Sequence, residues 1–256
     1  MFANQRQDEI YNLIKEKGNV TVDELMKKFD VSVETIRRDL IFLEKANSVK
    51  RVHGGAISVQ ASRKHEKFKK RLEENRPEKR ELAKTAINLI EEGDFISIDA
   101  GTTTIELVDE IKKHFHELVI VTNSGYVVEA LRGMEGFKIY LTGGIFMHDE
   151  NAFYGEIAIN NIKNFYIKKA FICPAGISEN GISDFDQELS DVQKAYIEAA
   201  EKKIILADSS KIGKDAFIKT AELTSDFVII TDSHIDEEKV KSFAEKDICI
   251  LGKAEN

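Results

Sequence analysis

Residues 21–56 read TVDELMKKFDVSVETIRRDLIFLEKANSVKRVHGGA, and this stretch decides how the first part of the chain folds. Thr21 and Glu24 have the spacing of a capping box, in which a hydroxyl and a carboxylate close the N-terminus of a helix. After a short turn, Ser32 can cap another helix that has apolar residues at helical spacing. Those apolar residues are Ile36, Leu40 and Leu43. Two short helices joined by a tight turn predict a helix-turn-helix.

The second of these helices presents polar side chains away from its apolar stripe. A guanidinium group can bond two acceptors on a guanine edge or grip a phosphate, so the adjacent Arg37 and Arg38 favour DNA recognition. Residues 49–57 alternate like a small basic hairpin, which predicts a wing. The alternative is a surface helix with solvated arginines. The expected contacts with double-stranded DNA are Ser32, Glu34, Thr35, Arg37, Arg38, Lys50, Arg51 and His53.

The net charge of −8 is unevenly distributed. Residues 1–60 carry 10 lysines and arginines against 9 acidic residues, and residues 61–80 carry 9 against 4, so the remainder holds −14. Because phosphate attraction is screened within about 10 Å, the local balance matters most for DNA binding. The acidic total therefore does not exclude a DNA-binding head.

The chain is expected to have three parts: a winged helix-turn-helix domain at 1–57, a charged linker at 58–77, and an α/β domain at 78–256. The linker is either solvated or adds phosphate contacts through Arg63, Lys64, Lys67, Lys69 and Lys70. Pro77 is expected in the first turn of the following helix, over residues 78–92.

From residue 81 onward, short apolar runs alternate with helical patterns. This alternation predicts an α/β domain, a mainly parallel, doubly wound sheet with helices on both faces. The expected strands are 95–99, 118–122, 138–142, 170–173, 203–207 and 227–230.

Small and polar residues follow the carboxyl ends of these strands, where open α/β sheets bind ligands. Three consecutive threonines at a helix N-terminus favour an anion, and a lysine after the fifth strand can pair with phosphate. Taken singly, each feature is at least as often only a cap or a turn; together they suit a phosphorylated sugar or polyol. The expected effector-binding residues are Asp99, Gly101, Thr102, Thr103, Thr104, Asn123, Gly143, Gly144 and Lys211.

The run TIRRDL…LE…R.HGGA resembles the signature of DeoR-type bacterial transcriptional regulators, and the strand-end segments resemble the sensor domain of that family. That sensor domain is similar to sugar-phosphate isomerases of the ribose 5-phosphate type. The resemblance implies a repressor of a carbohydrate catabolic operon that a phosphorylated sugar releases from its operator. An activator, a ligand-independent regulator and an isomerase-like enzyme remain alternatives, the last with Asp99, Asp184 and Asp186 as candidate carboxylates by location.

The chain departs from the family pattern at three places. Asn47 follows the recognition helix where glycine is usual. Lys168-Lys169 stands where an acidic residue is common, and Cys173-Pro174 where small residues are usual. The last two departures put effector contacts near that strand in question.

Other features exclude further classes. No apolar run approaches the 18 residues of a membrane span, and the polar N-terminus lacks a signal core. Two cysteines make no secreted disulfide framework, and no zinc spacing appears. We therefore expect a cytoplasmic protein without metal or cofactor. Because one helix contacts few bases, we expect a homodimer or homotetramer.

Overall fold

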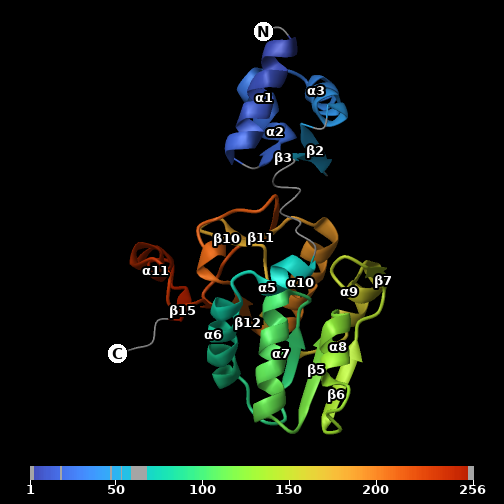
Figure 1. Cartoon of the computed structure of the whole chain (residues 1–256), viewed down its shortest axis with the longest axis vertical. Helices are drawn as coiled ribbons and strands as arrows, with labels where there is room; N and C mark the ends of the chain where they lie inside the picture. Colours follow the sequence, from blue (N-terminus) through green and yellow to red (C-terminus); the bar gives the residue numbers. More distant parts are fainter. Residues whose placement is uncertain (1–2, 18, 47, 53, 59–67, 253–256) are drawn as a thin grey trace. The chain divides into compact units, whose positions relative to one another are not determined.

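A computed structural model describes residues 3–17, 19–46, 48–52, 54–58 and 68–252. The chain divides into two compact units, residues 1–66 and 67–256 (Figure 1). Several predicted positions lie outside the described residues: Asn47, His53, Arg63, Lys64, Lys67 and the side chain of Lys69. None of the described helices has the length and apolar character that a membrane span needs.

The first unit is a winged helix-turn-helix, as the sequence predicts. Its helices are α1 (Ala3–Lys17), α2 (Val22–Phe29) and α3 (Val33–Lys45). Its strands β1 (Asn19–Thr21), β3 (Gly55–Ser58) and β2 (Val49–Val52) form an antiparallel sheet in that order. Buried Ile10, Ile14, Leu25, Ile36 and Leu40 form its core. Strand β1 was not predicted, because three residues carry too little alternation to identify a strand.

The second unit is built on a seven-stranded sheet in which every neighbouring pair is parallel. The strand order is β15-β14-β12-β9-β4-β5-β6. The bounds are β4 Phe95–Ile98, β5 Leu118–Thr122, β6 Phe137–Leu141, β9 Ile167–Ile172, β12 Ala200–Leu206, β14 Phe227–Ile230 and β15 Cys249–Leu251. All six predicted strands are confirmed within three residues at each end, and the edge strand β15 is additional.

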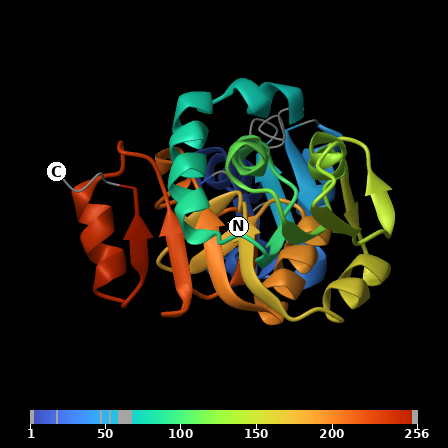
Figure 2. The same cartoon turned by 90° about the horizontal axis from the view of Figure 1, so that it is seen from below.

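Helices cover both faces of this sheet (Figure 2). Alternate residues of β9 show the division, because Phe171 packs into the cluster under one layer while Ala170 and Ile172 pack into the other. The first layer is α6 (Arg76–Ala86), α7 (Thr102–His114) and α8 (Gly125–Leu131). The second is α9 (Glu156–Ile162) and α10 (Gln187–Ala199), and α11 (Glu237–Ala244) packs beside β15.

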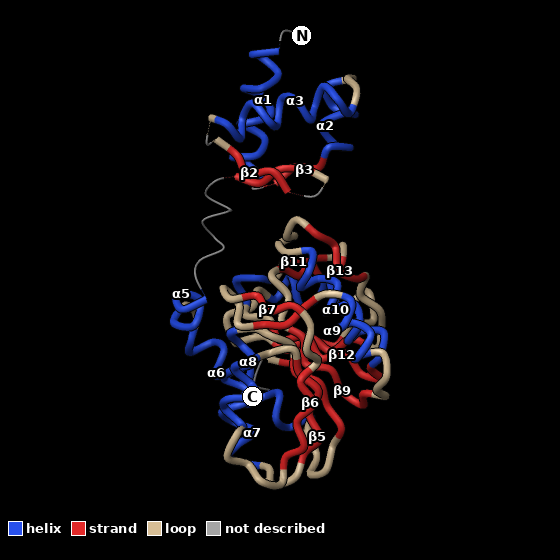
Figure 3. The backbone as a smooth tube through the Cα atoms, turned by 90° about the vertical axis from the view of Figure 1, so that its right-hand side faces the viewer, coloured by secondary structure: helices blue, strands red, loops and turns tan. Residues whose placement is uncertain are grey.

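Short strands of three or four residues lie at the carboxyl edge of the large sheet (Figures 1 and 3). Strands β7 (Ile145–Met147) and β8 (Ala152–Tyr154) form a hairpin. A second small sheet contains β10 (Gly176–Ser178), β11 (Gly181–Asp184) and β13 (Ile218–Ala221). These strands of three or four residues were not predicted.

The expected linker and the helix after it differ in the structure. Within residues 58–77, α5 (Phe68–Glu73) is a helix of the second unit that packs against α7, so the second unit begins earlier than residue 78. The helix expected over 78–92 ends at Ala86 and continues as the 3-10 turn η1 (Ile87–Leu89), because Ile90 takes an extended conformation. Pro77 lies in the first turn, as predicted.

Candidate DNA-binding and effector-binding sites

The recognition helix α3 presents its polar face to solvent. Arg37 and Arg38 are exposed, and neither makes an ion pair with another described residue. Ser32 caps the helix by accepting a hydrogen bond from the Thr35 amide at 3.4 Å, and its hydroxyl lies 3.1 Å from the Thr35 hydroxyl. Glu34 is exposed one residue before Thr35. The arginines are therefore available to a groove, while Ser32 and Thr35 also hold the helix start.

A buried ion pair fixes α3 against α1. Arg6 Nε donates to Asp39 at 2.6 Å, and both side chains are almost fully buried. The Gln7 amide donates to the other oxygen of Asp39 at 2.9 Å. Breaking such a pair would leave a buried charge without its partner. This pair was missed from the sequence, where nothing distinguishes Arg6 or Asp39 from solvated residues.

The wing is held to the recognition helix by one carboxylate. Glu44, near the end of α3, accepts from the backbone amide of Arg51 at 2.9 Å, and its other oxygen lies 3.8 Å from the Arg51 guanidinium. Lys50 is exposed next to it on β2. A hollow of about 250 Å³ lies between helix and wing, with Arg37 and Arg51 in its lining. Two predicted DNA-binding arginines thus border the same hollow.

In the second unit, the N-terminus of α7 lies at the carboxyl end of β4. Gly101 is extended, and a Cβ there would lie 2.8 Å from the Cβ of Cys173, so glycine allows this close approach. The Thr104 hydroxyl donates to the Asp99 carbonyl at 2.8 Å. Thr102 and Thr103 are buried in the first turn. The three hydroxyls are thus largely turned into the protein, and the turn offers an anion chiefly its backbone amides.

Two of the predicted effector residues, Asp99 and Lys211, can carry a charge, and Asp99 is the more buried of the two. Its carboxylate accepts from the Cys173 amide at 3.3 Å and from the Gln193 side chain at 3.0 Å. Burial raises the pKa of Asp99 to about 7, with nearby Asp184 adding to the effect. Gln193 also donates to Asp184 at 3.1 Å, and burial raises the pKa of that carboxyl too. Asp99 therefore supports the floor of the site, bridged to Asp184 by one amide.

Asn123 joins the neighbouring strand end to this floor. Its side-chain oxygen accepts from the Ala100 amide at 3.0 Å, and its nitrogen donates to the Phe153 carbonyl at 3.2 Å. Gly143 and Gly144 follow β6 with φ values of +66° and +108°, where a side chain is strained. Gly144 packs against strand β8, because a Cβ on Gly144 would lie 2.4 Å from the Tyr154 carbonyl oxygen.

Two lysines lie on the side of the α7 N-terminus away from Asn123. Lys211, in the 3-10 turn η2 (Ser209–Lys211) after β12, donates to the Pro174 carbonyl at 2.9 Å. Lys79 on α6 is 3% exposed and donates to the Arg71 carbonyl at the end of α5. Burial lowers the pKa of Lys79 to about 8, and Lys211 lowers it further by like-charge repulsion. Lys79 was not predicted from the sequence, because the packing of α6 sets its surroundings.

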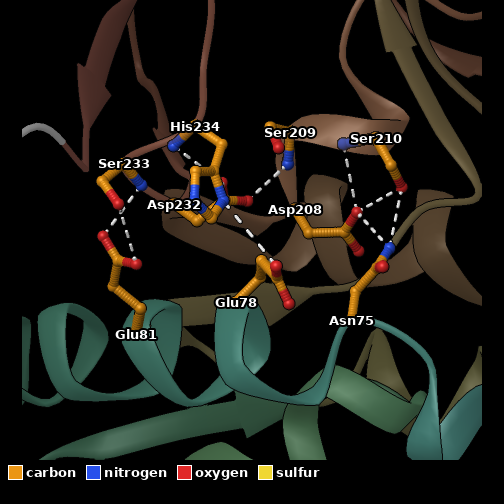
Figure 4. A network of polar contacts seen from close by, with 9 residues as sticks. All are labelled: Asn75, Glu78, Glu81, Asp208, Ser209, Ser210, Asp232, Ser233 and His234. Carbon is orange, nitrogen blue, oxygen red and sulfur yellow. Dashed lines mark hydrogen bonds and ion pairs between the residues drawn. The ribbon is translucent and has the colours of Figure 1, made fainter.

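A polar network pins α6 across the ends of β12 and β14 (Figure 4). Asn75 donates to Asp208 and to the Ser210 hydroxyl, each at 3.1 Å. At the other end, Glu81 accepts from the Ser233 amide at 2.8 Å. The helix that carries Lys79 is thereby held over the turn that carries Lys211.

The remaining candidate carboxylate has a structural role. Asp186 is the N-cap of α10 and accepts from the amides of Glu188 at 3.1 Å and Leu189 at 3.3 Å. Asp184, by contrast, belongs to the buried floor with Asp99. Of the carboxylates considered for isomerase chemistry, only Asp99 and Asp184 therefore lie together.

The two departures on β9 lie at opposite ends of that strand. Lys168 and Lys169 begin it and donate to Asp94 at 2.8 and 2.5 Å, so they belong to the amino edge of the sheet. Their position separates them from the effector residues, which end their strands. Cys173 follows the carboxyl end, and burial raises the pKa of its thiol to about 12. Only Cys173-Pro174 bears on the candidate site.

Among the residues that the structure describes, no group of three or more His, Cys, Asp or Glu side chains is placed to hold a metal ion. The candidate site is instead cationic, with Lys79 and Lys211 beside a helix N-terminus. Such an arrangement favours an anion such as a phosphate monoester.

Comparison with known proteins agrees with both units. Residues 6–62 match the family model of the DeoR-like helix-turn-helix domain, and residues 74–233 match that of the DeoR C terminal sensor domain. The HTH-type transcriptional repressor GlcR of Bacillus subtilis is 33% identical over 91% of this chain and 89% of its own length. The lactose phosphotransferase system repressor of Staphylococcus epidermidis is 35% identical over 94% of this chain and 97% of its own.

Among solved structures, the ribose 5-phosphate isomerase A of Methanocaldococcus jannaschii aligns with a TM-score of 0.39 and 15% identity. The alignment covers 54% of this chain and 55% of the isomerase.

Proposed function

Because the chain belongs to the DeoR family of transcriptional regulators, we propose that it represses a carbohydrate catabolic operon and leaves its operator when a phosphorylated sugar binds. The names of relatives support this: one is a lactose phosphotransferase system repressor and another a putative aga operon transcriptional repressor. The family is one of regulators, so the isomerase alternative is set aside. Operator binding places its action in the cytoplasm.

In this proposal the first unit holds the operator. Arg37 and Arg38 contact base edges or phosphates in the major groove, and Lys50 and Arg51 contact the backbone beside it. Glu34 and Thr35 flank the arginines on the exposed face of α3, and Ser32 marks its start. Their exposure on one helix and one adjoining strand supports the assignment.

The second unit takes the effector at the carboxyl edge of its sheet. The observation that carries this assignment is the position of Lys211, whose ammonium group bonds the Pro174 carbonyl next to Cys173, against which Gly101 packs at the start of α7. The buried Lys79 on α6 lies near it. A phosphate there would neutralise two ammonium groups that otherwise repel one another, and would accept from the amides of the first turn of α7. Asp99 and Asn123 position that turn, and Gly143 and Gly144 border the sugar end.

The test is a thermal-shift screen of the full-length protein against pentose and hexose phosphates, with the free sugars and inorganic phosphate as controls. A ligand that binds only the folded state raises the melting temperature by mass action. We expect one sugar phosphate to stabilise the protein and its free sugar to have no effect. Equal stabilisation by the free sugar would show that phosphate is not recognised.

The hit is then titrated into the protein bound to an operator selected from random duplexes. Loss of fluorescence anisotropy of the labelled duplex is the expected result. Stronger DNA binding in the presence of the sugar phosphate would overturn the repressor assignment in favour of an activator or co-repressed regulator.

A further inference from the structure

Two large apolar side chains are exposed next to one another on the recognition helix α3. Ile41 is 36% exposed and Phe42 is 56% exposed, whereas Ile36, Leu40 and Leu43 of the same helix are buried in the core. Apolar groups that stay in water add nothing to the stability of the free protein, since hydrophobic stabilisation needs area removed from water. A partner that covers either side chain would gain that stabilisation.

Ile41 belongs to the same exposed strip of α3 as the two arginines. On an α-helix, residues three and four apart are surface neighbours, so Ile41 adjoins both Arg37 and Arg38. Lys45 lies four residues further along and is also exposed, so it is the neighbour of Ile41 in the next turn. Ile41 is thus an apolar group framed by three cationic ones.

The contacts on the two flanks of α3 distinguish Ile41 from Phe42. Glu44, three residues after Ile41, accepts from a backbone amide of the wing strand β2 at 2.9 Å, so Ile41 lies on the flank toward the wing (Figure 1). Asp39, three residues before Phe42, pairs with Arg6 of α1, so Phe42 lies on the flank toward α1. Because the proposed DNA contacts come from α3 and β2, Ile41 is the exposed apolar side chain of α3 on the side that meets DNA.

The major groove of DNA offers one apolar group at the level of the base edges, the C5-methyl group of thymine. The phosphates that border the groove attract the cationic side chains beside Ile41. Four residues of helix rise about 6 Å and successive bases lie about 3.4 Å apart, so Ile41 reaches about two base-pair steps beyond Arg37. A branched aliphatic side chain flanked by cations therefore matches a thymine in a groove bordered by phosphates.

We propose that Ile41 determines part of the operator sequence by packing on the methyl group of a thymine. The inference rests on the proposed function, in which α3 lies in the major groove of an operator. Arg37 and Arg38 recognise hydrogen-bond acceptors such as those of guanine, so Ile41 adds a preference that their hydrogen bonds do not supply. Burying one methyl group contributes ~0.8 kcal/mol, which corresponds to about a fourfold preference for the methylated base.

The experiment first selects operators from random duplexes with the full-length wild type, Ile41→Ala and Phe42→Ala. Each thymine of the wild-type operator is then replaced in turn by deoxyuridine, which lacks only the C5-methyl group and keeps the same base pairing. Fluorescence anisotropy gives the affinity of each protein for each duplex. Phe42→Ala is the matched control, because it removes an exposed apolar side chain from the same helix on the flank toward α1. Circular dichroism melts establish that both variants are folded.

We expect deoxyuridine at one thymine of a half-site to weaken binding by the wild type and by Phe42→Ala about fourfold. Ile41→Ala should bind the two duplexes equally and should no longer select thymine at that position. An equal deoxyuridine penalty in Ile41→Ala, or no penalty at any thymine in the wild type, would overturn the proposal.

A wild type that selects no sequence at all would overturn the proposed function, and this inference with it. Because the operator is selected before any thymine is changed, failure of the proposed function and failure of the thymine contact are separate results.

Discussion

At the scale of single residues, the two exposed arginines of α3 carry the strongest prediction. Replacing Arg37 or Arg38 by alanine should cost about 1–3 kcal/mol of specific operator binding, because each loses base or phosphate hydrogen bonds. Fluorescence anisotropy with the selected operator measures the loss. Arg132→Ala, an exposed arginine directly after α8, should leave operator affinity unchanged. Wild-type affinity in both Arg37 and Arg38 variants would show that α3 is not the recognition helix.

The paired lysines make a second prediction at this scale. Lys211→Ala and Lys79→Met should each weaken sugar-phosphate binding by about ten- to a hundredfold, because a charged hydrogen bond contributes about 1.5–3 kcal/mol. DNA binding without effector should be preserved. Lys84→Met, on the exposed side of the same helix, is the control for Lys79. Thr103→Ala tests the first turn of α7, and a normal response in all variants would contradict the assigned phosphate position.

Asp99 makes the protein's stability depend on pH. Its folded-state pKa of about 7 lies above the ordinary value near 3.9 for an unfolded aspartate. The group therefore contributes stability below pH ~4 that is lost as pH rises through ~7. Asp99→Asn removes this loss, so the fall in unfolding free energy between these pH values should be shallower, by up to ~1.4 kcal/mol per pH unit.

Urea denaturation of wild type and Asp99→Asn across this range measures the two slopes. Asp184 remains in both proteins and acts with the same sign, so some slope should persist in the variant. Parallel stability profiles for the two proteins would show that Asp99 does not change its protonation on unfolding.

At the scale of elements, a hydrogen bond from the wing backbone to Glu44 of the recognition helix helps to hold the wing in place. Glu44→Ala removes the acceptor for the Arg51 amide and should reduce operator affinity by about 1 kcal/mol, the typical contribution of one hydrogen bond. Glu44→Gln keeps an oxygen acceptor and should retain most of the affinity. Equal losses in both variants would point to the charge of Glu44 rather than to its hydrogen bond with the Arg51 amide.

The elements that the sequence predicted are those specified by neighbouring residues. The capping box at Thr21 and the stripe of Ile36 and Leu40 need only local spacing, so the first unit was foreseen almost entirely. The long buried strands were equally evident. Strands of three residues, such as β7 and β10, contain too little alternation to be recognised. The sequence also did not reveal that Lys168 lies at the amino edge of the sheet, because this depends on the residue at which β9 begins.

The candidate site was foreseen less completely, because its contacts join distant residues. Positions at strand ends follow from topology, which is why Asp99, Asn123 and Lys211 were named. Lys79 lies on a helix more than a hundred residues before Lys211, and only the packing of α6 brings the two together. The contacts of Gln193 with Asp99 and Asp184 were missed for the same reason, since nothing in the sequence of a helix shows that a glutamine in it bonds buried carboxylates.

At the scale of the whole molecule, the described core residues form separate clusters in the two units. One cluster lies within residues 10–56, and the two others lie within residues 82–251. Calorimetry of the full chain should therefore show two unfolding transitions. Only the transition of the second unit should rise with a sugar phosphate, and only that of the first with operator DNA. A single transition that responds to both ligands would contradict independent cores.

The close approach of Gly101 to Cys173 also constrains how this protein can change over generations. A methyl group at position 101 would lie 2.8 Å from the Cβ of residue 173, so position 101 cannot gain a side chain while residue 173 keeps its Cβ in place. Lineages that acquire alanine at 101 should carry glycine at 173, and the two sites should vary together among homologues. Selection on the residue that follows β9 thereby also restricts which residue can begin the first turn of α7 in descendants of this chain.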